Sequence, residues 1–95
     1  MIVATSTLKL WTGDNATWHF ISIGAEESIE IRVHGLANPR GFGSVRVAAS
    51  IGEVTWRTSV FPQKSGGYLL PVKADVRRRA GIVAGDELTV KLDLL

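Results

Sequence analysis

The chain has 95 residues, of which 45% are hydrophobic and 21% are charged, and its formal net charge is +2. These values are typical of one soluble globular domain, so we expect a single domain over residues 1–95. The chain has no cysteine, which excludes disulfide bonds and thiolate metal sites. No apolar run reaches the roughly 20 residues that span a bilayer, and the N-terminus does not resemble a signal peptide. We therefore expect a cytoplasmic protein without membrane contact.

The N-terminal quarter of the chain predicts a β-hairpin. Val3–Trp11 and Thr17–Ile23 are rich in β-branched and aromatic residues, as strands are. The segment between them, Thr12–Ala16, contains turn-forming residues. His19 lies on the strand face opposite to its two aromatic neighbours, and we expect a structural role for it. His34 follows fifteen positions later, which is not a recognised spacing of metal ligands.

Residues 25–37 fit two kinds of secondary structure. Ile29, Val33 and Leu36 recur at helical spacing. Ile29, Ile31 and Val33 also alternate, which fits a strand. We favour a helix that covers one open end of a barrel.

Glycines and a proline mark the boundary after this segment. Gly35 and Asn38-Pro39 predict the end of the helix. Gly41-Phe42-Gly43 follows, and a glycine pair beside a strand can cradle a phosphate. No Lys-Ser/Thr follows these glycines, however, and the next element is a strand. A flexible lead into that strand is the favoured interpretation.

The clearest hairpin joins Ser44–Ile51 to Val54–Phe61. Gly52-Glu53 is a two-residue Gly-X loop, the type II′ choice. This loop length predicts that the inward positions pair as Ile51 with Val54, Ala49 with Trp56, Val47 with Thr58 and Val45 with Val60. The outward positions then pair as Ser50 with Thr55, Ala48 with Arg57 and Arg46 with Ser59.

The outward face of this hairpin carries the sharpest candidate site. Arg46 and Arg57 become diagonal neighbours. Two positive charges at so short a distance repel each other unless an anion or a carboxylate lies between them. Arginine also suits charge-assisted contacts with anions. The candidate ligand-binding residues are Arg46, Arg57, Ser59, Lys64, Lys73 and Arg77. A polar outer face without any ligand is the alternative explanation.

The C-terminal part predicts a strand, a short helix and a closing strand. Tyr68–Val72 is a strand that Pro71 closes, because proline cannot donate to the ladder. Lys73–Ala80 forms one or two helical turns, and Gly81 ends them as a left-handed cap. Glu87–Leu94 then alternates apolar and polar residues as a strand. Before this strand we expect the Asp86 carboxylate to accept backbone N–H bonds in the turn.

Charge is unevenly distributed along the chain. Residues 1–39 carry two Lys/Arg and four Asp/Glu, a net charge of −2, whereas residues 40–95 carry nine and five, a net charge of +4. The basic half permits an anionic partner. One alternative is therefore a nucleic-acid or protein-partner surface formed by Lys73, Arg77, Arg78 and Arg79.

A second alternative is a compact biosynthetic enzyme whose barrel holds a hydrophobic substrate. Small barrels can enclose a ligand, and the candidate lining residues are Trp11, Trp18, Trp56 and Tyr68. Core packing also accounts for these aromatic residues. No nucleophile–base pair, paired carboxylates or metal ligands stand out in the sequence, so no catalytic residue is assigned.

Several motifs carry a resemblance to a known family. They are Gly41–Val47, Ile51-Gly52, Trp56–Pro62, Gly67–Lys73, and the run of Arg77, Gly81-Ile82 and Gly85-Asp86. In this order, over Val3 to Leu92, the chain resembles domain-of-unknown-function family 1905. The resemblance implies a small double-split β-barrel capped by helices, and no particular reaction. The last run also resembles the swapped-hairpin half of AbrB-like transcription factors and antitoxins, which bind DNA as intertwined dimers.

Together these observations predict a mainly β protein, a double-split barrel of six to seven strands with one or two short helices. The function we favour is binding of a small anionic or polar ligand, without a cofactor or a metal ion. We expect a monomer or a homodimer.

Overall fold

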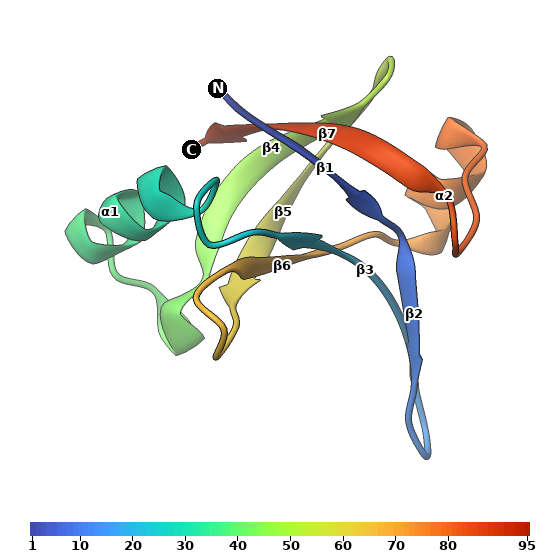
Figure 1. Ribbon diagram of the computed structural model, residues 1–95, viewed down its shortest axis with the longest axis horizontal. Helices are drawn as coiled ribbons and strands as arrows, with labels where there is room; N and C mark the ends of the chain where they lie inside the picture. Colours follow the sequence, from blue (N-terminus) through green and yellow to red (C-terminus); the bar gives the residue numbers. More distant parts are fainter.

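Seven antiparallel strands and two short helices form a curled half-barrel in the computed structural model, which describes residues 1–95 (Figure 1). The mainly β prediction and its strand count are therefore confirmed. The strands are β1 (Ile2–Thr7), β2 (Lys9–Thr12), β3 (Thr17–Ile23), β4 (Val45–Ile51), β5 (Val54–Pro62), β6 (Tyr68–Pro71) and β7 (Glu87–Leu94). The helices are α1 (Ile29–Ala37) and α2 (Ala74–Ala80), and a 3₁₀ turn, η1 (Gly41–Gly43), precedes β4.

The strands follow the spatial order β1-β7-β4-β5-β6-β3-β2. β5 is the strand that joins the two halves of this sheet. It pairs with β4 along Val54–Val60 and with β6 only at Phe61 and Pro62. The sheet therefore bends at β5, which belongs to both halves.

The first predicted strand, Val3–Trp11, is divided in two, which corrects the sequence interpretation. β1 pairs with β7, whereas β2 pairs with β3 on the far edge of the sheet. Leu8 lies between them and is buried. Its N–H donates to the Asp86 carbonyl at 2.9 Å, and its carbonyl accepts from the Gly85 N–H at 2.8 Å. These bonds hold the chain where it passes from one half of the sheet to the other.

The β4–β5 hairpin has the register that its two-residue loop predicts. Gly52 has a φ of 59°, whereas Glu53 has no positive φ, as a type II′ turn requires. The inward residues of β4 are all buried: Val45, Val47, Ala49 and Ile51. They belong to one cluster of 19 buried hydrophobic residues, which fills the inside of the curled sheet.

The C-terminal elements also match their predictions. Gly81 caps α2 in the left-handed conformation, with φ 67° and ψ 36°, and Val76 is the buried residue of this helix. The Asp86 Oδ2 accepts a hydrogen bond from the Val83 N–H at 2.9 Å. Leu88, Val90 and Leu92 of β7 are buried, and the residues that alternate with them are exposed.

Residues 29–37 are helical, as favoured, but the predicted apolar stripe is not the face that packs. Ile29, Val33 and Leu36 are 60%, 62% and 77% exposed, whereas Ile31 is fully buried. Gly35 lies inside the helix and does not end it. A Cβ at Gly35 would come within 3.0 Å of Val45. The helix therefore approaches the sheet through its smallest side chain, and this close contact decides which face is buried.

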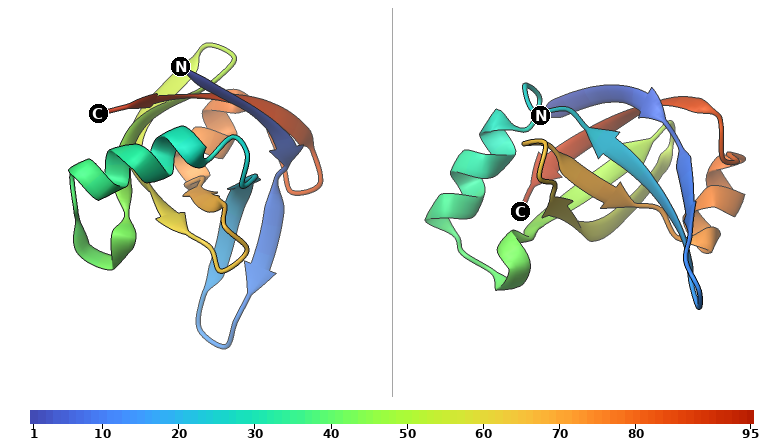
Figure 2. Two further views of the ribbon diagram at one scale, coloured as in Figure 1. Left: turned by 60° about the vertical axis from the view of Figure 1, so that its left-hand side comes forward. Right: turned by 60° about the horizontal axis from the view of Figure 1, so that its bottom comes forward.

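The two helices lie at opposite ends of the half-barrel (Figure 2). α1 contacts β4 and α2 contacts β5. The prediction that helices cover the ends of the barrel is thereby confirmed. Neither helix is long and apolar enough to cross a lipid bilayer.

Gly67 provides a test of this packing, because a Cβ there would overlap the carbonyl oxygen of Ile23 on β3. We expect Gly67→Ala to destabilise the protein by about 1–3 kcal/mol, the usual cost of overpacking a buried site. Gly41→Ala is the matched control, since nothing lies within 4 Å of its added Cβ. Urea unfolding followed by tryptophan fluorescence measures both values. Equal unfolding midpoints for the two variants would contradict the close approach.

Candidate functional site

A cleft opens where β5 separates from β6. The two strands pair only at Phe61↔Leu69 and Pro62↔Tyr68. Away from this pairing, β5 lies beside β4. The segment that follows β6 leaves the sheet at Pro71 and turns into α2. The space between these segments is a cleft of about 580 Å³ lined by 12 residues. We call it the cationic cleft because of the side chains that line it.

Three cations and no carboxylate line the cationic cleft. They are Arg46 of β4, Lys73 before α2, and Arg77 of α2. The Arg46 Nη1 donates to the Ser59 Oγ at 3.4 Å. The Arg77 Nη1 donates to the Val72 carbonyl oxygen at 2.6 Å. These contacts hold both guanidinium groups at the cleft, where three hydroxyl side chains also lie: Thr17, Thr58 and Ser59.

No acidic side chain neutralises these cations. The two salt bridges of the chain both use Asp75, with Arg78 at 3.6 Å and Arg79 at 3.2 Å. Both are exposed pairs on the surface of α2. The positive charge of Arg46, Lys73 and Arg77 is therefore left without a protein counterion.

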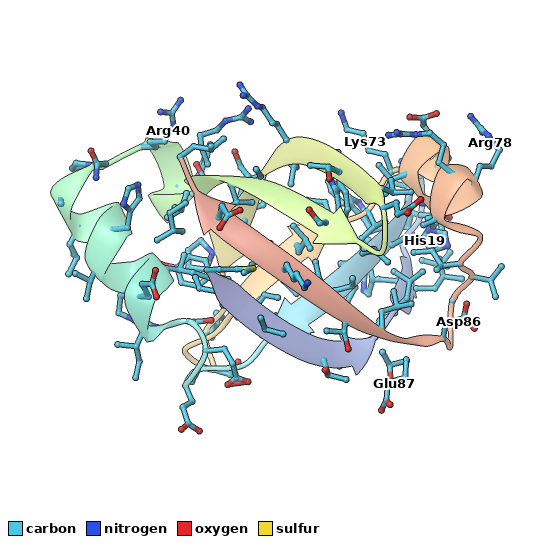
Figure 3. All side chains as sticks on the ribbon, turned by 90° about the horizontal axis from the view of Figure 1, so that it is seen from above. His19, Arg40, Lys73, Arg78, Asp86 and Glu87 are labelled. Atoms are coloured by element: carbon cyan, nitrogen blue, oxygen red, sulfur yellow. The ribbon has the colours of Figure 1, made fainter.

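His19 of β3 also lines the cationic cleft, and Figure 3 shows it with Lys73 at the end of the molecule that carries α2. Burial lowers the pKa of His19 below its ordinary value of 6.5, and the nearby charge of Arg77 lowers it further. The backbone of His19 accepts a hydrogen bond from the Val72 N–H at 3.0 Å. Sequence reasoning assigned His19 only a structural role, because nothing in the sequence shows that Arg77 of α2 lies near it.

The structure brings together four of the six predicted ligand-binding residues. Arg46, Ser59, Lys73 and Arg77 line the cationic cleft. Arg57 and Lys64 are exposed and line none of the four cavities. Arg57 lies nearer to the Gly52 turn than the part of β5 that borders the cleft, and Lys64 lies in the loop between β5 and β6.

Of the four residues proposed for a nucleic-acid surface, only two lie at the cationic cleft. Lys73 and Arg77 line the cationic cleft, whereas Arg78 and Arg79 pair with Asp75 on the exposed side of α2. The glycines of Gly41–Gly43 lie in an exposed turn that borders no cavity. No three His, Asp or Glu side chains lie close enough together to hold a metal ion.

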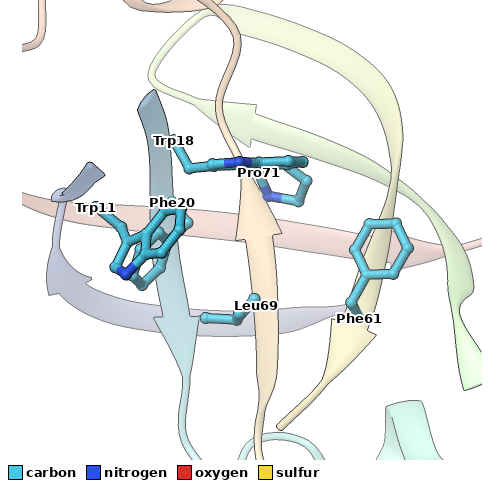
Figure 4. A pocket seen from close by; sticks show the side chains of 6 residues that line it. All are labelled: Trp11, Trp18, Phe20, Phe61, Leu69 and Pro71. Carbon is cyan, nitrogen blue, oxygen red and sulfur yellow. The ribbon is translucent and has the colours of Figure 1, made fainter. Parts of the chain in front are cut away.

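The four aromatic residues of the enzyme alternative do not line a common cavity. Tyr68 is buried in the core, and Trp56 is half-buried against it with no hydrogen-bond partner for its Nε1. Trp11 and Trp18 lie on the outer face of the sheet. There they line a second, apolar cleft of about 460 Å³ together with Phe20, Phe61, Leu69 and Pro71 (Figure 4).

The electrostatics of His19 can be checked directly. We expect its pKa, measured by NMR titration, to lie below 6.5 and to rise in Arg77→Gln, because the neighbouring positive charge is gone. The rise should be partial, since burial is the larger cause. Arg78→Gln is the control, because Arg78 pairs with Asp75 outside the cationic cleft. A His19 pKa that is unchanged in Arg77→Gln would show that the two side chains do not interact.

The chain matches the family described as "Domain of unknown function (DUF1905)" over residues 5–92, which is nearly its whole length. No curated protein matches the sequence. The family resemblance predicted from the motifs is therefore confirmed, and this chain belongs to the DUF1905 family of domains of unknown function.

Proposed function

We propose that this domain binds a small anion, or the phosphate, sulfate or carboxylate group of a small molecule, in the cationic cleft. One observation carries the proposal: Arg46, Lys73 and Arg77 line the same cleft, and none of its 12 lining residues is acidic. Cations brought together without a counterion repel each other, and a bound anion removes that repulsion.

The chemistry of the lining residues supports this choice. A guanidinium group presents several N–H donors in a plane that matches a carboxylate or a phosphate. The hydrogen bonds of Arg46 to Ser59 and of Arg77 to Val72 orient both groups before any ligand arrives. Less conformational entropy is then lost on binding. The hydroxyl groups along the cleft add donors for further anion oxygens.

The arrangement favours a small ligand over a nucleic acid. A phosphate backbone is contacted by basic residues spread along a surface. Here the cations converge on one cleft of about 580 Å³, within the range of small-molecule sites. Arg78 and Arg79, which face solvent, already pair with Asp75.

The cleft also favours binding over catalysis. His19 is its only side chain that titrates near neutral pH. No hydrogen bond joins the His19 ring to a hydroxyl group, so no nucleophile–base pair is assembled.

The first test is binding of inorganic sulfate at constant ionic strength, followed by NMR chemical shifts. We expect the double variant Arg46→Gln/Arg77→Gln to bind at least about tenfold more weakly, because two charge-assisted hydrogen bonds are lost. Arg57→Gln is the matched control, as it removes an arginine from the same hairpin outside the cleft. If the control and the double variant lose the same affinity for sulfate, the loss reflects only the net charge of the protein, and the proposed site is contradicted.

A titration with duplex DNA at low and moderate salt tests the nucleic-acid alternative. We expect no specific complex. A steeply salt-dependent complex that Arg78→Gln/Arg79→Gln weakens would favour that alternative over the anion site.

The affinity for sulfate should also depend on pH through His19. In the free protein its pKa is lowered, and a bound anion would raise it, so binding takes up a proton. Affinity should therefore increase as the pH falls toward and below 6.5, by up to about tenfold for each unit that the anion raises the pKa. Sulfate is the suitable probe because it does not titrate near neutral pH. His19→Gln should remove this dependence, and a pH profile unchanged in that variant would exclude His19 from the site.

A further inference from the structure

The outer face of one half of the sheet has an unusual composition. When one face of an antiparallel sheet is exposed to water, its outward positions are normally polar. In β2, β3, β6 and β5 several outward positions are apolar instead, and they are neighbours across the strands. The pairs are Trp11 with Trp18, Phe20 with Pro71, and Leu69 with Phe61. Together these six residues line the apolar cleft.

The apolar cleft is open to water in the free protein. Trp11 and Trp18 are 55% and 54% exposed. Figure 4 shows Trp11 and Phe20 on one side of β6, Phe61 on the other, and Trp18 reaching toward Pro71. An added Cβ at Gly13 would overlap the Trp11 ring, so the ring lies against the turn of the hairpin. This contact keeps the indole at the edge of the cleft.

The apolar cleft and the cationic cleft adjoin each other. Trp18, Phe61 and Pro71 line both of them. A molecule that lies across these three residues therefore reaches Arg46, Lys73 and Arg77 at one end. At the other end it reaches the ring of Trp11, which borders the apolar cleft alone.

We propose that the ligand is an aromatic organic anion, whose charged group lies in the cationic cleft and whose flat apolar body lies in the apolar cleft. This inference rests on the proposed function and specifies the ligand class. Charge complementarity selects the anionic group, and the three residues shared by the two clefts place an apolar body beside it. Indole and phenyl side chains provide flat surfaces on which an aromatic ring stacks. Burial of the exposed apolar surface favours this arrangement in water.

The test compares two probes with the same charged group. We expect 1-naphthalenesulfonate to bind at least about tenfold more tightly than methanesulfonate at constant ionic strength, because only the former fills the apolar cleft. Isothermal titration calorimetry measures the affinities, and NMR shifts locate each probe. The neutral analogue 1-naphthalenemethanol should bind more weakly than the sulfonate, since it lacks the charge.

Variants assign the gain in affinity to the apolar cleft. Trp11→Thr should remove most of the preference for the naphthyl probe and leave methanesulfonate binding unchanged. Gly13→Ala should act in the same direction by displacing the Trp11 ring. Leu10→Thr is the matched control, because Leu10 is an exposed neighbour on β2 that lines neither cleft. Circular dichroism checks that each variant is folded.

The outcomes separate this inference from the proposed function. If methanesulfonate binds through Arg46 and Arg77 but the naphthyl group adds no affinity, the anion site stands and the aromatic ligand class is overturned. If neither sulfonate binds, both proposals fail. If Arg46→Gln/Arg77→Gln leaves the affinity for 1-naphthalenesulfonate unchanged, the proposal that one ligand occupies both clefts is overturned. The same holds if the neutral analogue binds as tightly as the sulfonate. Binding to phosphatidylglycerol vesicles that 1-naphthalenesulfonate does not displace would indicate a lipid surface instead, and would also overturn the inference.

Discussion

The candidate site depends on the position of β5 in two halves of one sheet. β5 uses most of its length to pair with β4, and only Phe61 and Pro62 pair with β6. A strand that serves two halves of a bent sheet cannot keep a continuous ladder on both sides. The gap that results is bordered by α2, because Pro71 has no N–H with which to continue β6. The cationic cleft follows from this separation of two neighbouring strands.

The three charges in the cleft come from two separate segments of the chain. Arg46 lies on β4, Lys73 at the start of α2, and Arg77 one turn later. Burial of Val76 turns α2 so that Arg77 faces His19, while Arg78 and Arg79 turn toward Asp75. Burial is the main cause of the lowered pKa of His19, and the uncompensated charge of Arg77 lowers it further. In the free protein this repulsion opposes folding, and on the proposed function an anion would relieve it.

The two clefts also show how a small domain provides a binding surface without an empty core. Its interior is occupied by one cluster of buried side chains. Both clefts therefore lie outside the core: the apolar cleft lies on the outer side of the sheet, and the cationic cleft lies where β5 separates from β6. Trp18, Phe61 and Pro71 are shared between them, so an apolar wall adjoins the cationic groups. Water is partly excluded beside such a wall, which strengthens electrostatic contacts with a ligand.

Local patterns were sufficient to predict most of the secondary structure and one register. The Gly52-Glu53 loop fixes the pairing of β4 with β5, because a two-residue turn allows one alignment. Gly81 predicts the end of α2, and the alternation of apolar and polar residues predicts β7. Both predictions depend only on residues that are close in sequence. Of the six residues proposed as ligand-binding from charge and chain position, four line the cationic cleft.

The tertiary structure alone decided which of these side chains meet. Arg57 looked like a partner of Arg46 because they are neighbours across the hairpin, yet the cleft forms on the α2 side and does not include it. α1 buries Ile31 and not its more obvious apolar stripe, because Gly35 permits a closer approach to Val45. His19 comes near Arg77 only when α2 packs beside β5. A sequence determines periodicity and turns through near neighbours, whereas clefts arise from contacts between distant segments, whose geometry no local pattern contains.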